Sequence, residues 1–390
     1  MRNMDRFSLR CAVERLRDGL FDPVAVNRLT VEKDHIETIF SKGLKTLEKG
    51  KSDHLCICGS YGQGKSHTLT YLNQLALSQG YATSVVQLDI REVPFPQFST
   101  VYQSIMERLV LPDGLTFTSA WKDWADKDSL KLVDTMPHRF KVILTAMLCK
   151  SKKLTPKESS LKKHQAYQPK EHGQWLDKAL MGYNIPAAQL KSVCKYREVE
   201  GYKEHSLICR GNDSYFQMVQ SLGSLLKEMG YKGLVLFFDE AESIAQGRLP
   251  HRVKSYHLLD QFFQTEGSGT SGSGTPGSVF SVFAFTDDFF DKVKDEEYDN
   301  GKETFPKNYA EAWQDLTVFR LSNFTSHGWE SLLDRLMQLY SQAYQIDLPL
   351  QVKPSLQALI AKLEAQETRC KLKALVNKLD VETQQALLDA

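Results

Sequence analysis

The stretch CGSYGQGKSHTLTYL, Cys58 to Leu72, decides the fold that we expect for this chain. It places three glycines just before one lysine, and an apolar run leads into it. Residues 59–66 fit the pattern G-x-x-x-x-G-K-[ST], which is typical of a phosphate-binding loop when a strand precedes it and a helix follows. Both conditions are met, because the preceding run has no polar alternation and leucines at helical spacing follow. The stretch therefore predicts a loop that holds phosphate.

Each residue type in this loop has a role in binding phosphate. Glycines let successive backbone N–H groups turn toward the phosphate, and the N-terminus of the next helix adds the positive end of its dipole. We expect Lys65 to neutralise the terminal phosphate oxygens and the Ser66 hydroxyl to bind Mg²⁺. The predicted nucleotide-binding residues are Gly59, Ser60, Tyr61, Gly62, Gln63, Gly64, Lys65, Ser66 and His67.

A second candidate group closes the apolar run GLVLFFDE, residues 233–240. Ligands of open α/β sheets bind at the carboxyl ends of the strands, so this acid pair is expected beside the loop. We predict that Asp239 holds Mg²⁺ through water and that Glu240 polarises the attacking water. Glu242 is a spare acid nearby. The adjacent acid pair favours an ATPase over a small-molecule kinase or a GTPase, and so predicts ATP and Mg²⁺ as cofactors.

Five apolar runs indicate strands, at residues 55–58, 82–90, 233–240, 278–286 and 316–321. Helical patterns separate them, and this alternation indicates an α/β fold with a parallel five-stranded sheet. Thr286 ends the fourth run, where its hydroxyl is expected to orient the attacking water against the γ-phosphate. Asp287 and Asp288, which follow it, are expected to cap the next helix.

The chain divides into three expected units. Residues 1–50 form an N-terminal helical segment, residues 51–324 a P-loop ATPase core, and residues 325–390 a C-terminal helical lid. Within the core, residues from about 91 to 230 far exceed the dozen or so that a crossover connection needs. Their pattern is mainly helical, so they predict an inserted helical subdomain.

Composition limits the other classes of function. The 390 residues have a formal net charge of +1, so no field of the whole chain attracts it to nucleic acid or membrane. No stretch approaches the ~18 apolar residues of a membrane span, and the first residues lack the apolar region of a signal peptide. The seven cysteines are scattered, and Cys56 and Cys58 are expected to be buried reduced thiols. We therefore expect a cytoplasmic protein with no membrane partner.

With these residues placed, the chain resembles the BREX-type ATP-binding family, P-loop ATPases of AAA+ or origin-recognition-like build found in bacterial phage-defence islands. The most specific shared stretches are GSYGQGKSHTLTYLNQLAL and GYKGLVLFFDEAES. The stretches AVERLRDGLFDPVAVNRL, MPHRFKVILTAML, WLDKALMG and ETRCKLKALVNKLD extend the resemblance over most of the chain. The resemblance implies an AAA+-like ATPase of a phage-defence system, with defence proteins such as a helicase or methyltransferase as partners.

The resemblance also assigns a catalytic role to Arg369, as the lid arginine (sensor 2) that reports nucleotide to the C-terminal helices. The family's motif reads Thr-Pro-Arg, whereas this chain has Glu367-Thr368-Arg369 and lacks the proline. AAA+ rings usually carry a trans-acting arginine after the sensor strand, but no arginine occurs from Val253 to Phe319. Arg248 and Arg252 are the candidates, and a homo-oligomer with a shared site stays open.

Three hypotheses describe what ATP would drive. The first is a DNA-directed motor or switch, because the segment Lys150–Lys170 carries seven lysines against one glutamate and is able to contact the phosphate backbone. The second is a regulatory nucleotide switch that docks a partner protein and hydrolyses slowly. The third is a replication initiator or loader. The sequence does not separate them.

Overall fold

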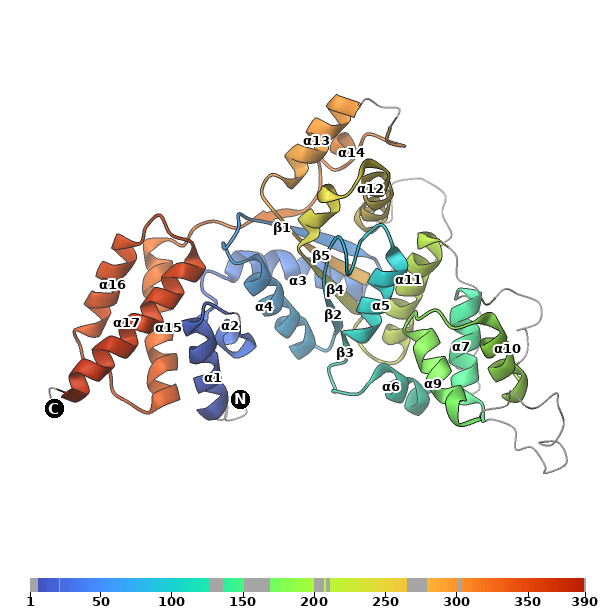
Figure 1. Ribbon diagram of the computed structural model, residues 1–390, viewed down its shortest axis with the longest axis horizontal. Helices are drawn as coiled ribbons and strands as arrows, with labels where there is room; N and C mark the ends of the chain where they lie inside the picture. Colours follow the sequence, from blue (N-terminus) through green and yellow to red (C-terminus); the bar gives the residue numbers. More distant parts are fainter. Residues whose placement is uncertain are drawn as a thin grey trace.

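The computed structural model describes residues 6–20, 22–125, 136–150, 169–199, 207, 211–264, 279–300 and 304–388. It is an α/β fold in which helices cover both faces of one central sheet, with further helices at its two ends (Figure 1). No helix among these residues is long and apolar enough to cross a bilayer. Cys56 and Cys58 are buried and free, as predicted.

The central sheet is mixed and has six strands. They are β1 (Asp53–Cys58), β2 (Ala82–Gln87), β3 (Leu109–Val110), β4 (Leu234–Asp239), β5 (Val279–Phe285) and β6 (Val318–Arg320), in the spatial order β3-β2-β4-β5-β1-β6. β3 is antiparallel to β2, and the remaining neighbours pair in parallel. The predicted α/β class is confirmed, but the purely parallel five-stranded sheet is wrong. A two-residue strand such as β3 is too short to leave a periodic pattern in the sequence.

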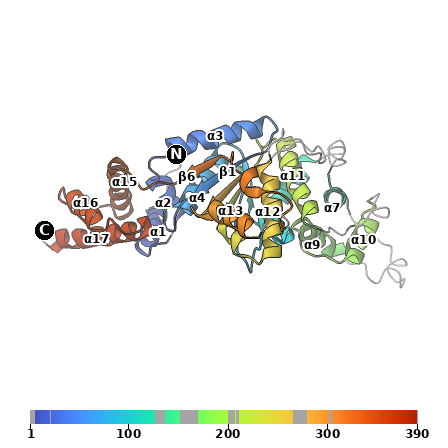
Figure 2. The ribbon, with the colours of Figure 1, turned by 90° about the horizontal axis from the view of Figure 1, so that it is seen from above.

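Two apolar cores lie on the two faces of this sheet, because successive residues of a buried strand point to opposite faces. Phe237 and Phe280 face α3 (Asp34–Glu48) and α4 (Lys65–Ser78). Phe238 and Phe283 face the other side, where their rings stack at 4.6 Å. The helices on that side are α5 (Phe98–Glu107), α11 (Asn212–Glu228) and α12 (Leu249–Phe263). Figure 2 shows α3 along one face of the strands.

The long connection between β2 and β4 is largely helical in its described part. Its helices are α5, α6 (Phe117–Trp124), α7 (His138–Leu148), α9 (Pro169–Leu180), α10 (Ala187–Tyr196) and α11. α7, α9 and α10 pack together at the end of the molecule opposite the chain termini (Figure 1). Residues 151–168, which carry most of the predicted DNA-binding lysines, lie outside the described residues.

Helices from the two ends of the chain form a second body, which we call the terminal helical body. It consists of α1 (Arg6–Arg17), α2 (Pro23–Leu29), α15 (Ser326–Tyr344), α16 (Val352–Lys362) and α17 (Thr368–Leu388). These helices share one apolar core, to which α1 contributes Val13 and α17 contributes Leu379. The N-terminal region is therefore divided, since α1 and α2 pack with the C-terminal helices while α3 packs on the sheet.

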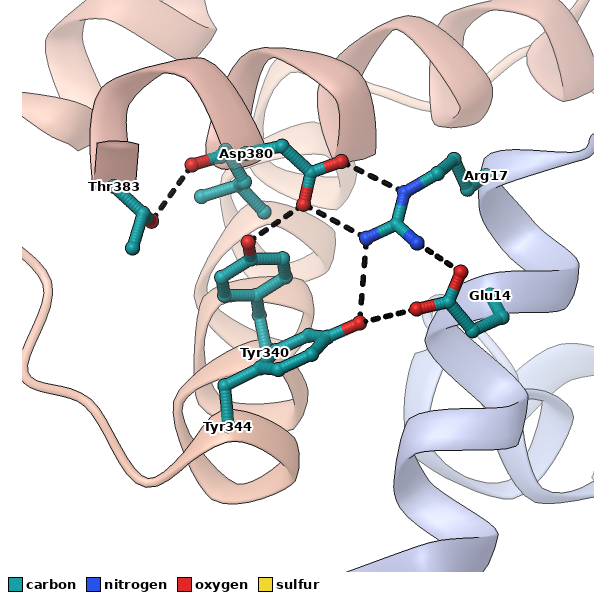
Figure 3. Close-up of polar contacts among 7 residues, drawn as sticks. Glu14, Arg17, Tyr340, Tyr344, Asp380 and Thr383 are labelled. Carbon is teal, nitrogen blue, oxygen red and sulfur yellow. Dashed lines mark hydrogen bonds and ion pairs between the residues drawn. The ribbon is translucent and has the colours of Figure 1, made fainter. Parts of the chain in front are cut away.

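A polar network ties α1 to the C-terminal helices (Figure 3). The Arg17 guanidinium binds Asp380 with two hydrogen bonds, Nε to Oδ2 at 2.7 Å and Nη2 to Oδ1 at 2.8 Å. Tyr340 donates to the same carboxylate at 2.6 Å, and Tyr344 donates to Glu14 at 2.7 Å. The bond to Arg17 lowers the pKa of Glu14, and the bond to Asp380 raises the pKa of Arg17. Both groups stay charged, so the network fixes α1 on α15 and α17.

Candidate functional site

The strand order places the predicted site residues at one edge of the sheet. β1, β4 and β5 are parallel, and β5 lies between the other two. The glycine loop follows β1, Asp239 ends β4, and Thr286 follows β5. Thr286 therefore lies at the edge of the sheet between the strand that precedes the loop and the strand that ends in the acid pair.

The loop has the backbone that its glycines permit. Gly62 has φ +72° and Gly64 has φ +105°, a region that residues with a Cβ atom rarely adopt. A Cβ atom on Gly64 would meet nothing within 4 Å, so this part of the loop faces open space at the start of α4. Inside the loop, the Gln63 side chain accepts a hydrogen bond from the Ser60 N–H at 2.7 Å. The loop is thus preformed, with its helix N-terminus open to a ligand.

Lys65 is buried against its own loop. Its ammonium donates to the Gly59 carbonyl at 2.9 Å and lies 3.8 Å from the Glu242 carboxylate, while only 8% of the residue is exposed. Glu242 is also buried, and this burial raises its pKa. The sequence indicated Glu242 only as a spare acid. The structure shows it as the ion-pair partner of Lys65, because the turn after β4 brings it behind the loop.

Glu240 has a strained backbone at the end of β4. Its φ of +56° and ψ of +34° are left-handed, which costs roughly 1–2 kcal/mol for a residue other than glycine. Such strain is concentrated at functional sites. Burial raises the pKa of Glu240, and the neighbouring Asp239 charge raises it further, whereas Lys65 and Arg369 act in the opposite direction. Arg369 is thus within electrostatic reach of Glu240, although α17 lies far away in sequence.

A cavity of about 250 Å³ opens between the loop and the terminal helical body. Lys65, Ser66, Glu240 and Arg369 all line it. Asp239 and Thr286 are not among its lining residues. The walls beyond the loop are mostly apolar and include Leu16, Val26, Leu29, Ile36, Phe319 and Phe324. The cavity therefore has a charged end and an apolar end. This arrangement suits a ligand in which phosphates are attached to a flat ring of low charge.

His67 links the loop helix to the segment between α2 and α3. Its Nε2 atom lies 2.8 Å from the Thr30 hydroxyl oxygen. Burial lowers the pKa of His67 to about 4, so the ring is neutral near pH 7. Residues 30–33 also line the cavity, as does His67 itself.

The oxygen donors at this edge fit a magnesium ion. Mg²⁺ is usually bound by one or two carboxylates together with water and substrate phosphates, rather than by a cage of protein ligands. The Asp239 carboxylate stands at the strand end, where one of its oxygens accepts the Glu240 N–H at 3.0 Å. The Ser66 hydroxyl belongs to the first turn of α4 and lines the cavity.

The structure brings Asp287, expected only as a helix cap, and Arg320 to the glycine loop. Asp287 accepts a hydrogen bond from the Ser60 hydroxyl at 2.8 Å and lies 3.8 Å from the Arg320 guanidinium. Arg320 is the last residue of β6, which is the fifth predicted strand. Because ligands bind at the carboxyl ends of parallel strands, its position in the sequence already indicated a candidate site residue. Arg252, a candidate trans-acting arginine, pairs with Glu296 at 3.0 Å within the chain.

Residues 8–124 and 209–388 match the family model described as BREX system ATP-binding protein BrxC/D. The chain belongs to this family. The match covers most of the chain and includes the glycine loop, the acid pair and α17, so the predicted resemblance is confirmed. It leaves out residues 125–208, which hold α7, α9 and α10.

Other comparisons add little to the BREX assignment. The Walker-type ATPase of Pyrococcus abyssi is a solved structure with 11% sequence identity, and the alignment covers 92% of this chain and 75% of that one. Its TM-score is 0.33, which is too low to support an argument about function. No curated protein matches the chain.

Proposed function

We propose that this BREX-family protein hydrolyses ATP with Mg²⁺ and uses the energy as a motor or switch subunit of a phage-defence system. The observation that carries the proposal is that Lys65, Glu240 and Arg369 line one cavity together with the glycine loop. These residues come from the start of α4, the end of β4 and the start of α17. A cation, an acid and a second cation around an anion-binding loop are the groups that phosphoryl transfer requires.

Each residue has a distinct part in the proposed reaction. The loop N–H groups and the N-terminus of α4 bind the phosphates, and Lys65 turns from the Gly59 carbonyl to their terminal oxygens. Glu240 orients the attacking water and accepts its proton, while Thr286 helps to hold that water. Ser66 and Asp239 would hold Mg²⁺, which supplies positive charge to the phosphate oxygens.

We also propose that the terminal helical body acts as a lid. It contributes Arg369 and several apolar walls to the cavity, whereas the core contributes the loop. The Glu367 side chain lies directly against Gly62, so the turn before α17 already contacts the phosphate-binding loop. Closure of this body over a nucleotide would bring Arg369 toward the transferred phosphate and exclude water.

Replacement of Glu240 tests the proposed hydrolysis. Glu240→Gln keeps the shape of the side chain and removes its charge, so we expect Mg-ATP binding to persist while steady-state turnover falls at least about 100-fold. Glu228→Gln, an exposed acid at the end of α11, is the matched control and should hydrolyse at the parent rate. Parent-like turnover in Glu240→Gln would remove Glu240 from the mechanism.

DNA is the partner that we propose for the motor function, and its support is the lysine density of the Lys150–Lys170 segment. Lysines that neutralise phosphates release counterions, so binding should weaken steeply with salt. Changing the segment's lysines to glutamate should abolish salt-dependent DNA affinity and DNA stimulation of ATPase activity. Unchanged affinity would exclude this segment as the DNA contact.

The alternative is a slow nucleotide switch that docks a protein partner, such as a helicase or methyltransferase of the defence system. It is favoured by α7, α9 and α10, which lie beyond the part that the family shares. Slow turnover that DNA does not change would support it, as would loss of a partner complex after deletion of these helices. A replication loader and a homo-oligomer that shares its sites are further proposals, which loading assays and sedimentation with ATP would test.

A further inference from the structure

His67 lines the cavity, as do the polar residues Thr30, Glu32 and Lys33. It occupies the first turn of α4, two residues after Lys65, and its ring reaches the segment that joins α2 to α3. Leu29 and Ile36 lie at the two ends of that segment and line the same cavity. A nucleotide whose phosphates rest on the loop would extend its base along this wall.

The hydrogen bonds around Thr30 assign the proton on the His67 ring. The Thr30 hydroxyl has one hydrogen, and it donates that hydrogen to the Val26 carbonyl at 2.7 Å. Its oxygen must therefore accept from His67, so Nε2 carries a proton. In a neutral imidazole one ring nitrogen carries the proton and the other accepts hydrogen bonds. Only Nδ1 is left to meet a ligand, and it is an acceptor.

We propose that His67 is the residue that selects adenine over guanine, by accepting a hydrogen bond at Nδ1 from the 6-amino group. This inference rests on the proposed nucleotide site and deepens it. Guanine carries an oxygen at the same position, which would face Nδ1 acceptor to acceptor and lose its hydrogen bond with water. Thr30 is a positioning residue here, because it fixes which ring nitrogen holds the proton.

Two replacements of similar shape test the roles of the two ring nitrogens one at a time. In His67→Asn the side-chain amide reaches the place of Nδ1, so its oxygen is able to replace the acceptor. In His67→Gln the amide reaches the place of Nε2, so the contact with Thr30 is kept while the acceptor at Nδ1 is lost. Thr30→Val is a third variant that leaves His67 in place and removes the group that holds its tautomer.

The measurement is the dissociation constant of each full-length variant for Mg-ATP, Mg-GTP, Mg-ITP and Mg-dATP, by calorimetry. For the parent we expect ATP to bind about 10- to 100-fold more tightly than GTP or ITP, since both carry the 6-oxo group. This preference should fall to within about threefold in His67→Gln and decrease in Thr30→Val, and His67→Asn should retain it. ATP and dATP should bind alike in the parent.

Two results would overturn the assignment. One is a base preference that survives in His67→Gln or is absent from the parent. The other is a parent preference for ATP over dATP that disappears in His67→Gln, which would show that Nδ1 meets a ribose hydroxyl instead. If His67→Gln does not fold, as judged by its circular dichroism, the ratios of ATP to GTP affinity in Thr30→Val and His67→Asn test the assignment instead. Failure of the parent to bind any triphosphate would instead refute the proposed function itself.

Discussion

A methyl group on Gly62 should weaken nucleotide binding by an amount that the loop geometry sets. Gly62→Ala places a Cβ atom on a residue with φ +72°. The same atom would lie only 2.7 Å from Cδ of Glu367, so the lid turn must move as well. The substitution therefore strains the loop and displaces the turn before α17 together.

The cost of the left-handed backbone at residue 62 sets the size of the expected loss in affinity for ATP. Left-handed conformation costs an L-residue roughly 1–2 kcal/mol, which corresponds to about a 5- to 30-fold loss in affinity if the free loop relaxes and must return to bind. The contact with Glu367 adds a further cost, because the carboxylate is able to swing away but Cβ of Glu367, 3.0 Å from the added atom, moves only with the turn. In the double variant Gly62→Ala, Glu367→Ala, the carboxylate contact is absent, while the backbone cost and the 3.0 Å approach to Cβ of residue 367 remain.

Calorimetric titration of the single and double variants with Mg-ATP measures the backbone cost and the cost of the Glu367 contact. Gly114→Ala is the matched control, because Gly114 has φ +78° and open space around it but lies outside the cavity. It should cost similar stability and leave the affinity for ATP unchanged. Parent-like affinity in Gly62→Ala would show that the loop does not need its left-handed backbone to bind phosphate.

Two further predictions concern the terminal helical body. Arg369→Ala should slow turnover and shift the acid limb of the pH–rate profile to higher pH, because Arg369 lowers the pKa of Glu240 and loss of the arginine raises that pKa further. Lys373→Ala, one turn along α17, is the control. An unchanged pH–rate profile in Arg369→Ala would show that Arg369 does not act on the titration of Glu240. Replacing Arg17 by Met and Asp380 by Asn, singly and together, should show a coupling of about 1–2 kcal/mol in denaturant unfolding followed by tryptophan fluorescence. Additive effects would mean that the network of Figure 3 does not hold α1 on α17.

The glycine loop and the acid pair were predictable because their chemistry is local in sequence. Eight consecutive residues carry the loop pattern, and five apolar residues before Asp239 are enough to identify a buried strand. The rule that ligands bind at the carboxyl ends of parallel strands then places Thr286 near both. The family model independently covers both motifs.

Other features depend on contacts between distant residues, which no local pattern records. The helical period of α1 shows that it has an apolar face, but the same face would fit the sheet or the C-terminal helices equally well. The ion pair between Lys65 and Glu242 depends on the turn after β4, and the bond from His67 to Thr30 joins residues 37 positions apart. Arg320 ends a three-residue strand, and its place beside the glycine loop depends on its ion pair with Asp287, 33 positions away.

Titration of Mg-ATP into the folded full-length chain, followed by calorimetry, tests the central claim most directly. Lys65→Ala is the paired variant, because it removes the charge at the terminal phosphates and leaves Glu242 without its ion-pair partner. We expect saturable heat with one site per chain for the parent, which chelation of Mg²⁺ weakens, and no measurable binding for Lys65→Ala. Absence of heat in the folded parent, or equal binding by Lys65→Ala, would contradict the proposed nucleotide site.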